Sequence, residues 1–119
     1  LLSNEDLINK ITLINFFASW CTPCKAEHPL FFEIKNKYQN LFILGINMQD
    51  ENSKAIQFLN NDGNPYDYVG VDTKGFTAIE FGVVGLPETF LVDANGKIIY
   101  KYLGPLTEEV IKNEIEPLL

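Results

Sequence analysis

The sequence of 119 residues contains no arginine, one histidine, one tryptophan and only two cysteines. Its nine lysines face 16 acidic residues, which gives a formal net charge of −7. Nucleic acids and anionic lipid surfaces are bound through patches of Lys and Arg, so this composition argues against both as partners. Hydrophobic residues make up 46% of the chain, enough for one core, and the length fits a single domain over residues 1–119.

The two cysteines, Cys21 and Cys24, stand in a C-x-x-C spacing. A domain held together by disulfides normally has more cysteines, spread more widely along the chain. A zinc site would need two further ligands, and His28 is the only other candidate. The spacing therefore favours a redox pair over a structural bridge or a metal centre. We expect no metal and no cofactor other than the disulfide itself.

Long hydrophobic runs are also missing, and no segment of the sequence is apolar over enough residues to span a membrane. Hydrophobic periodicity instead predicts an α/β fold of alternating elements. Strands are expected at 11–18, 41–47, 68–71, 88–92 and 97–102, and helices at 23–39, 53–60, 77–81 and from Thr107 onward. Ser53 is the predicted cap of the second helix, and residues 93–96 are a predicted hairpin turn. This order favours a mixed sheet with helices on both faces.

The C-x-x-C pair lies where the first predicted strand passes into the first predicted helix. Backbone N–H groups and the positive end of the helix dipole stabilise a thiolate there and lower the pKa of Cys21. Pro23 suits the first turn of a helix, because its missing N–H would have no partner there. We assign Cys21, expected to be the more exposed, as nucleophile and Cys24 as the resolving thiol that releases the reduced partner.

Residues 16–25, Phe-Phe-Ala-Ser-Trp-Cys-Thr-Pro-Cys-Lys, resemble the active-site segment of the thioredoxin superfamily. Pro29 stands where thioredoxins bend this helix. Residues 82–90, Gly-Val-Val-Gly-Leu-Pro-Glu-Thr-Phe, resemble the cis-proline loop of the same superfamily. By this resemblance the Leu86–Pro87 peptide bond is cis and packs against the disulfide. The backbone beside it would then pair with an extended segment of the substrate.

Three segments narrow the resemblance to the cytochrome c maturation thioredoxins, the DsbE/CcmG group and its TlpA/ResA relatives. They are 24–29 (Cys-Lys-Ala-Glu-His-Pro), 63–66 (Gly-Asn-Pro-Tyr) and 85–93 (Gly-Leu-Pro-Glu-Thr-Phe-Leu-Val-Asp). The resemblance runs from about Leu13 to Leu118. It implies a thioredoxin fold in which residues 50–72, approximately, form an inserted helix and strand.

The resemblance also implies a function. Proteins of this group reduce the disulfide in the C-x-x-C-H haem motif of apocytochrome c. A membrane electron donor of the DsbD/CcdA type reduces them again. They face the periplasm, usually on an N-terminal membrane anchor, which would precede Leu1. We expect this chain to be monomeric.

Acidic and polar residues around the pair have predicted roles by the same resemblance. Asn15 stands where ordinary thioredoxins carry a buried acid beneath the disulfide, and it cannot ionise. Glu27 and Glu88 resemble the acidic residues around the site in the cytochrome group. A partly buried carboxylate with a raised pKa could accept the proton of Cys24. The alternative for both is a solvated surface charge.

The remaining candidates contact the disulfide or a partner. Trp20 is predicted to shield the pair and to contact partners, with core filling as the alternative. Thr22 and Pro23, between the cysteines, influence the balance of dithiol and disulfide, and Leu86 precedes the cis-proline. His28 is read as a surface or packing residue rather than a general base.

Other functions stay open at this point. The chain could be a broader extracytoplasmic thiol–disulfide reductase or an oxidant, because C-x-x-C alone does not set the direction of electron flow. A peroxide-reducing relative would carry its attacking cysteine in a different motif. A redox-inactive module that clamps peptides is the alternative outside enzymes, and the two intact cysteines count against it.

Overall fold

The computed structural model describes residues 10–72 and 74–119. Five strands form one sheet in the order β3-β2-β1-β4-β5. They are β1 (Thr12–Phe17), β2 (Phe42–Met48), β3 (Tyr68–Asp72), β4 (Glu88–Val92) and β5 (Ile98–Leu103). The first three strands are parallel, and β4 and β5 are antiparallel to their neighbours. The sheet is therefore mixed, as predicted.

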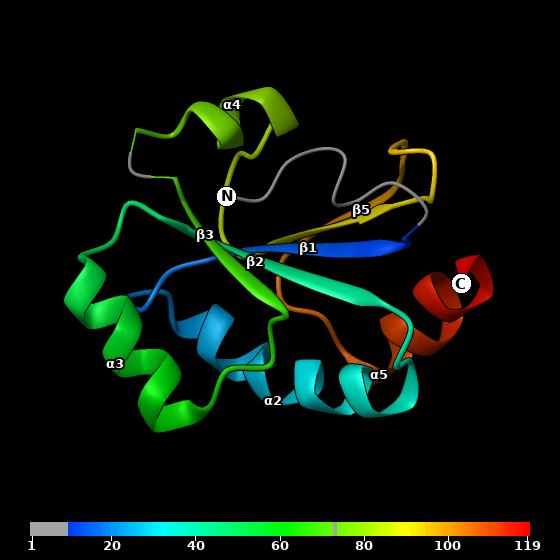
Figure 1. The fold of residues 1–119 in the computed structure, drawn as a ribbon, viewed down its shortest axis with the longest axis horizontal. Coiled ribbons are helices and arrows are strands. Elements are labelled where there is room, and N and C mark those ends of the chain that lie inside the picture. Colours follow the sequence, from blue (N-terminus) through cyan, green and yellow to red (C-terminus); the bar gives the residue numbers. More distant parts are fainter. Residues whose placement is uncertain (1–9, 73) are drawn as a thin grey trace.

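Helices cover both faces of the sheet (Figure 1). They are α2 (Thr22–Lys37), α3 (Asn52–Asp62), α4 (Phe76–Phe81) and α5 (Glu108–Val110), which continues into the short helices η1 (Ile111–Ile115) and η2 (Glu116–Leu118). In Figure 1, α2 and α5 lie below the sheet and α4 lies above it. The helix and strand at 52–62 and 68–72 occupy the segment for which an insertion is predicted.

Alternation along β1 separates two hydrophobic cores. Leu13 and Phe17 belong to the core shared with α2 and α3, whereas Ile14 and Phe16 belong to the core shared with α4. Successive side chains of a strand point to opposite faces, so Asn15 faces the α2 side with Leu13 and Phe17. All six residues of β1 are buried, which explains why this strand reads as a continuous apolar run.

Two local predictions are wrong. The N-cap of α3 is Glu51 and not Ser53, because the helix begins one residue earlier than the apolar spacing indicates. The last helix does begin at the predicted place, where the hydroxyl of Thr107, its N-cap, accepts from the Val110 N–H at 3.2 Å. It is not one regular α-helix, since π and 3₁₀ turns follow at residues 111–118. Hydrophobic periodicity does not distinguish these variants over a few residues.

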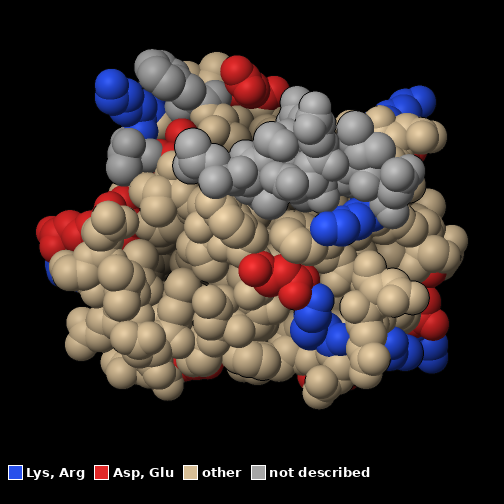
Figure 2. Space-filling model, in the orientation of Figure 1, with Lys and Arg blue, Asp and Glu red and all other residues tan. Residues whose placement is uncertain are grey.

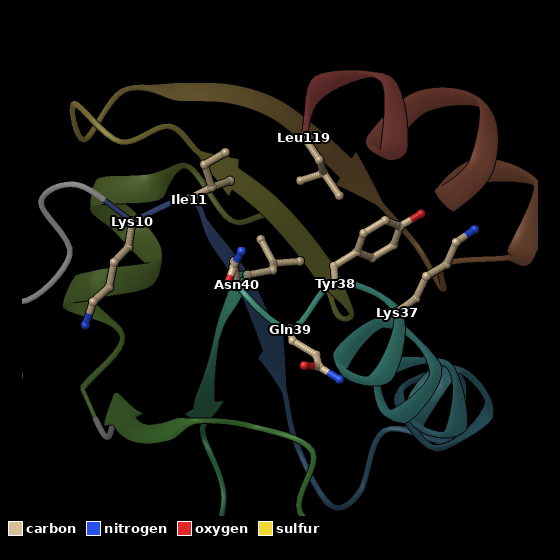
Figure 3. A pocket seen from close by; sticks show the side chains of 8 residues that line it. Lys10, Ile11, Lys37, Tyr38, Gln39, Asn40 and Leu119 are labelled. Atoms are coloured by element: carbon tan, nitrogen blue, oxygen red, sulfur yellow. The ribbon is translucent and has the colours of Figure 1, made fainter.

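The two ends of the sheet differ. A hollow of about 480 Å³ lies at the end where β1 begins, between the start of that strand and the end of α2 (Figure 3). Its lining includes Lys10, Ile11, Tyr38 and Leu119, and neither cysteine. The C-x-x-C motif follows the other end of β1, about six residues away along an extended strand. The redox pair and this hollow are thus on opposite sides of the molecule.

Candidate active site

Cys21 and Cys24 form a disulfide at the start of α2. Cys21 is the N-cap of the helix, and its Sγ accepts a hydrogen bond from the Cys24 N–H at 3.2 Å. The helix thus presents a free backbone donor to the sulfur that is predicted to be the nucleophile, which favours its thiolate form. Pro23 lies in the first turn and Pro29 inside the helix, both as predicted.

Exposure around the pair is uneven. Cys21 and Cys24 are 4% and 2% exposed, so in the disulfide form the predicted difference between them is slight. Both sulfurs pack into the core shared with Phe31 and Leu106. Trp20 is 58% exposed, which excludes the core-filling alternative for its side chain. Thr22 and Pro23 are exposed as well.

The turn before the pair is held by the segment that follows β2. Cys21 N–H donates to the Ala18 carbonyl at 3.2 Å and closes the turn. Within it, the Ser19 N–H donates to Asp50 Oδ2 at 2.7 Å, and the Trp20 indole N–H donates to the Gln49 carbonyl at 2.8 Å. The carboxyl ends of parallel neighbours β1 and β2 meet at one edge of the sheet, which brings these segments together.

The Leu86–Pro87 peptide bond is cis, as predicted. Pro87 is buried and comes directly before β4, whose first residue, Glu88, is paired with Phe16 of β1. This pairing places the loop before β4 beside the end of β1 from which the C-x-x-C motif continues. Leu86 is half-buried and packs against both cores.

Glu88 is completely buried, so the alternative of a solvated surface charge does not apply. Its register with Phe16 places its side chain on the α4 face of the sheet, opposite to Asn15. Glu88 Oε2 accepts from the N–H groups of Val84 and Gly85 at 2.7 and 3.3 Å, and Oε1 lies 3.2 Å from the ammonium group of Lys101. Glu88 therefore braces the loop that leads to Pro87.

Glu27 is buried on the other face, one helical turn beyond Cys24. Its Oε1 accepts from Asn15 Nδ2 at 2.9 Å, and its Oε2 accepts from the Leu106 N–H at 2.7 Å. Burial raises the pKa of Glu27 to about 7, against the two hydrogen bonds, which lower it. A carboxyl group with this pKa exchanges protons near neutral pH.

Asn15 connects Glu27 to a wider buried network. The Tyr66 hydroxyl donates to Asn15 Oδ1 at 2.8 Å, and Asn15 Nδ2 also lies 3.3 Å from Thr89 Oγ1. Burial, with a smaller contribution from the charge of Glu27, raises the pKa of Tyr66, so the phenol remains a donor. The amide of Asn15 has both of its functions used, one toward an acid and one toward a phenol.

Prediction from the sequence missed three contributors to the site: Asp50, Lys101 and the hydroxyl of Tyr66. Lys101 and Asp50 look like ordinary surface charges, because their partners are distant in sequence. A usable signal exists only for Asp50, which follows a predicted parallel strand at the edge where the redox motif also emerges. His28 is buried, and its Nε2 lies 2.8 Å from the Gly63 carbonyl, which agrees with a packing role.

In residues 10–72 and 74–119, no group of three or more His, Cys, Asp or Glu side chains is placed to hold a metal ion. None of the helices in that part of the chain is both long and apolar enough to cross a bilayer. On the face shown in Figure 2, uncharged residues make up most of the described surface, with basic and acidic side chains scattered over it.

Comparison with known proteins agrees with this geometry. The sequence profile of the Redoxin family matches residues 1–118. The chain belongs to the Redoxin family. The thiol:disulfide interchange protein CycY of Rhizobium leguminosarum bv. viciae is 43% identical over 118 residues, covering 99% of this chain and 63% of CycY. HelX of Rhodobacter capsulatus, also a thiol:disulfide interchange protein, is 44% identical over 110 residues, covering 92% of this chain and 61% of HelX.

A solved structure confirms the predicted thioredoxin fold of this Redoxin domain. The crystal structure of a putative thiol:disulfide interchange protein DsbE from Chlorobium tepidum superposes with a TM-score of 0.82 at 29% identity, covering 96% of this chain and 82% of that one. The predicted relationship to the DsbE group is thus confirmed. The chain spans about three fifths of the length of the two curated relatives.

Proposed function

We propose that this chain is a thiol–disulfide oxidoreductase that reduces the disulfide in the C-x-x-C-H haem motif of apocytochrome c. The observation that carries the proposal is the Cys21–Cys24 disulfide, capped by the N-terminus of α2, at the end of β1 where the cis-proline loop also lies. Relatives named as thiol:disulfide interchange proteins support the chemistry. The resemblance of segments 24–29, 63–66 and 85–93 to the cytochrome c maturation group supports the substrate.

The reaction begins from the reduced protein. The Cys21 thiolate attacks one sulfur of the substrate disulfide, forms a mixed disulfide and releases the other substrate sulfur as a thiolate. Cys24 then loses its proton and attacks Cys21 Sγ. This step forms the Cys21–Cys24 disulfide and releases the second substrate sulfur, which takes up a proton. Two electrons have passed from the protein to the substrate.

Glu27 is our candidate for the group that accepts the proton of Cys24. It lies one turn away on the same helix, it is buried, and its pKa of about 7 suits proton transfer near neutral pH. Glu88 faces the opposite side of the sheet and is bound to Val84, Gly85 and Lys101. We assign it the positioning of the cis-proline loop, where Leu86 and Pro87 would meet an extended substrate.

Trp20, Thr22 and Pro23 form the exposed rim of the pair and would contact the partner. A membrane dithiol donor of the DsbD/CcdA type would restore the reduced state. We also propose a periplasmic location on an N-terminal membrane anchor and a monomeric state. The electron donor and the location follow from the resemblance to the cytochrome c maturation group, whereas a monomer is the default for a domain of this size.

A trapping experiment tests the function. A Cys24→Ser variant cannot complete the second step, so it should accumulate a mixed disulfide through Cys21 with an oxidised C-x-x-C-H peptide, visible by mass. Cys21→Ser is the control and should form no adduct. Equal capture of unrelated disulfide peptides would favour a broader reductase, and the absence of any adduct would favour a redox-inactive module.

The reduction potential of the pair separates the reductase from the oxidant. Equilibration of the wild-type protein in dithiothreitol buffers should give a value near that of thioredoxin, about −270 mV. A value near that of a strong oxidant, about −120 mV, would reverse the direction of electron flow and rule out the proposed reduction of apocytochrome c.

A further inference from the structure

The two residues before Cys21 are bound to the segment between β2 and α3, far away in sequence. Ser19 donates to both oxygens of Asp50, with its N–H to Oδ2 at 2.7 Å and its hydroxyl to Oδ1 at 2.8 Å. The Trp20 indole donates to the carbonyl of the preceding residue, Gln49, at 2.8 Å. Each residue in the centre of the turn that ends at Cys21 thus has its own partner in residues 49–50.

Asp50 acts as an acceptor on both of its oxygens. Besides the two bonds from Ser19, Oδ2 accepts from Asn47 Nδ2 at 3.1 Å and Oδ1 accepts from the Glu51 N–H at 2.9 Å. Partial burial raises the pKa of Asp50, but the bonds from Ser19, Asn47 and Glu51 outweigh it and lower that pKa overall. Asparagine would keep the shape and turn one NH₂ group toward these donors. Only a carboxylate satisfies all four.

Gln49 has a left-handed backbone, with φ at 46°. Non-glycine residues adopt this conformation rarely and keep it where surrounding contacts enforce it. Here the enforcing contacts lie on both sides of its peptide: the Gln49 carbonyl accepts from Trp20, and the side chain of the next residue, Asp50, binds Ser19. The unusual backbone is therefore tied to the redox turn.

A purely local role would be to start α3, since Asp50 lies just before that helix. The hydrogen bonds of Asp50 do not favour this local role. The two shortest bonds of Asp50 go to Ser19, and only the Glu51 N–H belongs to the approach to α3. The N-cap of α3 is Glu51 itself. The contacts of Asp50 are thus weighted toward the active-site turn.

We propose that Asp50 is a positioning residue for disulfide exchange: its carboxylate fixes Ser19 and, with the Gln49 carbonyl, sets the turn that carries Trp20 and Cys21. Loosening this turn would let Cys21 leave the geometry needed for in-line attack on a substrate sulfur. The proposal rests on the disulfide exchange proposed above and is independent of the haem-motif substrate.

The test compares Asp50→Asn with Asp93→Asn. Asp93 is a matched control, because its Oδ1 also accepts two backbone N–H groups, from Asn95 and Lys97, in the hairpin between β4 and β5. Reduced protein is mixed with oxidised glutathione and, separately, with an oxidised C-x-x-C-H peptide, and the second-order rate constant is measured. Asp50→Asn should lower this constant about tenfold with both disulfides, whereas Asp93→Asn should stay within about twofold of wild type.

Trp20 provides a readout that a loss of stability alone would not change. It is the single tryptophan of the chain, so the fluorescence difference between disulfide and dithiol forms reports its position relative to the pair. Asp50→Asn should alter this difference at temperatures where the protein is fully folded, and Asp93→Asn should not. Unchanged rates and an unchanged fluorescence difference in folded Asp50→Asn would overturn the proposal.

A second variant and the comparison of the two substrates allow the proposal on Asp50 to be tested even if Asp50→Asn does not fold or the haem-motif function fails. If Asp50→Asn does not fold, Ser19→Ala removes only the hydroxyl bond to Oδ1 and should lower the rate about two- to threefold. An unchanged rate in that variant would overturn the proposal. If wild-type protein reacts with glutathione disulfide and ignores the peptide, the haem-motif function fails while the effect of Asp50 is still decided by glutathione.

Discussion

Replacing Glu27 by glutamine tests the buried carboxyl group on the α2 face. In the oxidised protein, burial raises the pKa of Glu27 from an ordinary 4.5 to about 7, so between these pH values the folded state holds a proton that the unfolded chain has lost. Stability must then fall as the pH rises through this window. At about 1.4 kcal/mol for each pH unit, the full interval corresponds to about 3 kcal/mol, an order-of-magnitude value.

Glu27→Gln fixes a neutral side chain of the same size. It should lose one of the two hydrogen bonds, since its NH₂ group must face either Asn15 or the Leu106 N–H. That loss is the same at every pH. The free energy of unfolding of wild type, minus that of the variant, should therefore decrease by about 2–3 kcal/mol from pH 5 to pH 8.

Urea denaturation of both oxidised proteins across this range measures the difference, and other titrating groups cancel in the subtraction. Glu33→Gln is the matched control, because Glu33 lies exposed on the same helix and its replacement removes the same charge. If the difference between wild type and Glu27→Gln stays constant from pH 5 to pH 8, the reasoning from burial is refuted, and Glu27 loses its main support as proton acceptor.

Two more substitutions test the frame around the site. Gly45→Ala should cost about 1–3 kcal/mol in thermal or urea unfolding, because the new Cβ would lie 2.7 Å from ring carbons of Tyr66. Gly70→Ala, in the neighbouring strand, is the control. It should change stability by less than about 0.5 kcal/mol, since no described atom lies within 4 Å of its Cβ position. Equal losses of stability in the two variants would contradict the packing argument. Lys101→Met should cost about 1–2 kcal/mol by leaving the buried Glu88 carboxylate without its cation, less than for a fully buried pair because Lys101 is 43% exposed. In the Glu88→Gln background, Lys101→Met should cost far less stability, which a double-mutant cycle measured by urea unfolding would show. An equal cost in both backgrounds would mean that Lys101 and Glu88 do not stabilise each other.

The features that sequence predicts well here are those with local causes. Cys21, Cys24 and Pro23 identify a redox pair at a helix start, because capping and the missing proline N–H act within a few residues. The apolar run of β1 is readable because that strand is buried on both faces. The predicted start of the last helix near Thr107 is likewise local, because the side chain of Thr107 caps that helix.

What sequence does not predict depends on which face a residue occupies. Glu27 and Glu88 look alike as acidic neighbours of the motif segments, yet the register of β4 on β1 sends Glu88 to the α4 face while α2 turns Glu27 toward Asn15. A one-residue change in register would exchange the faces of β4. The pairing of Asp50 with Ser19 and that of Lys101 with Glu88 are also beyond local patterns, because the two residues of each pair are distant in sequence.

The antiparallel pairing of β1 with β4 has a consequence for how the chain tolerates changes in length. The disulfide motif and the cis-proline loop are each joined to this pair by short connections, with three residues between Phe17 and Cys21 and none between Pro87 and Glu88. The elements from α2 to α4 lie in the long stretch of sequence between the disulfide motif and the cis-proline loop. Residues can be added at loops of this stretch other than the Gln49–Asp50 segment, which binds the active-site turn, without moving the two halves of the site relative to each other. One residue added between Phe17 and Cys21 or at Pro87–Glu88 would shift them directly. Insertions and deletions should therefore occur in the loops of this long stretch, while the two short connections keep a fixed length.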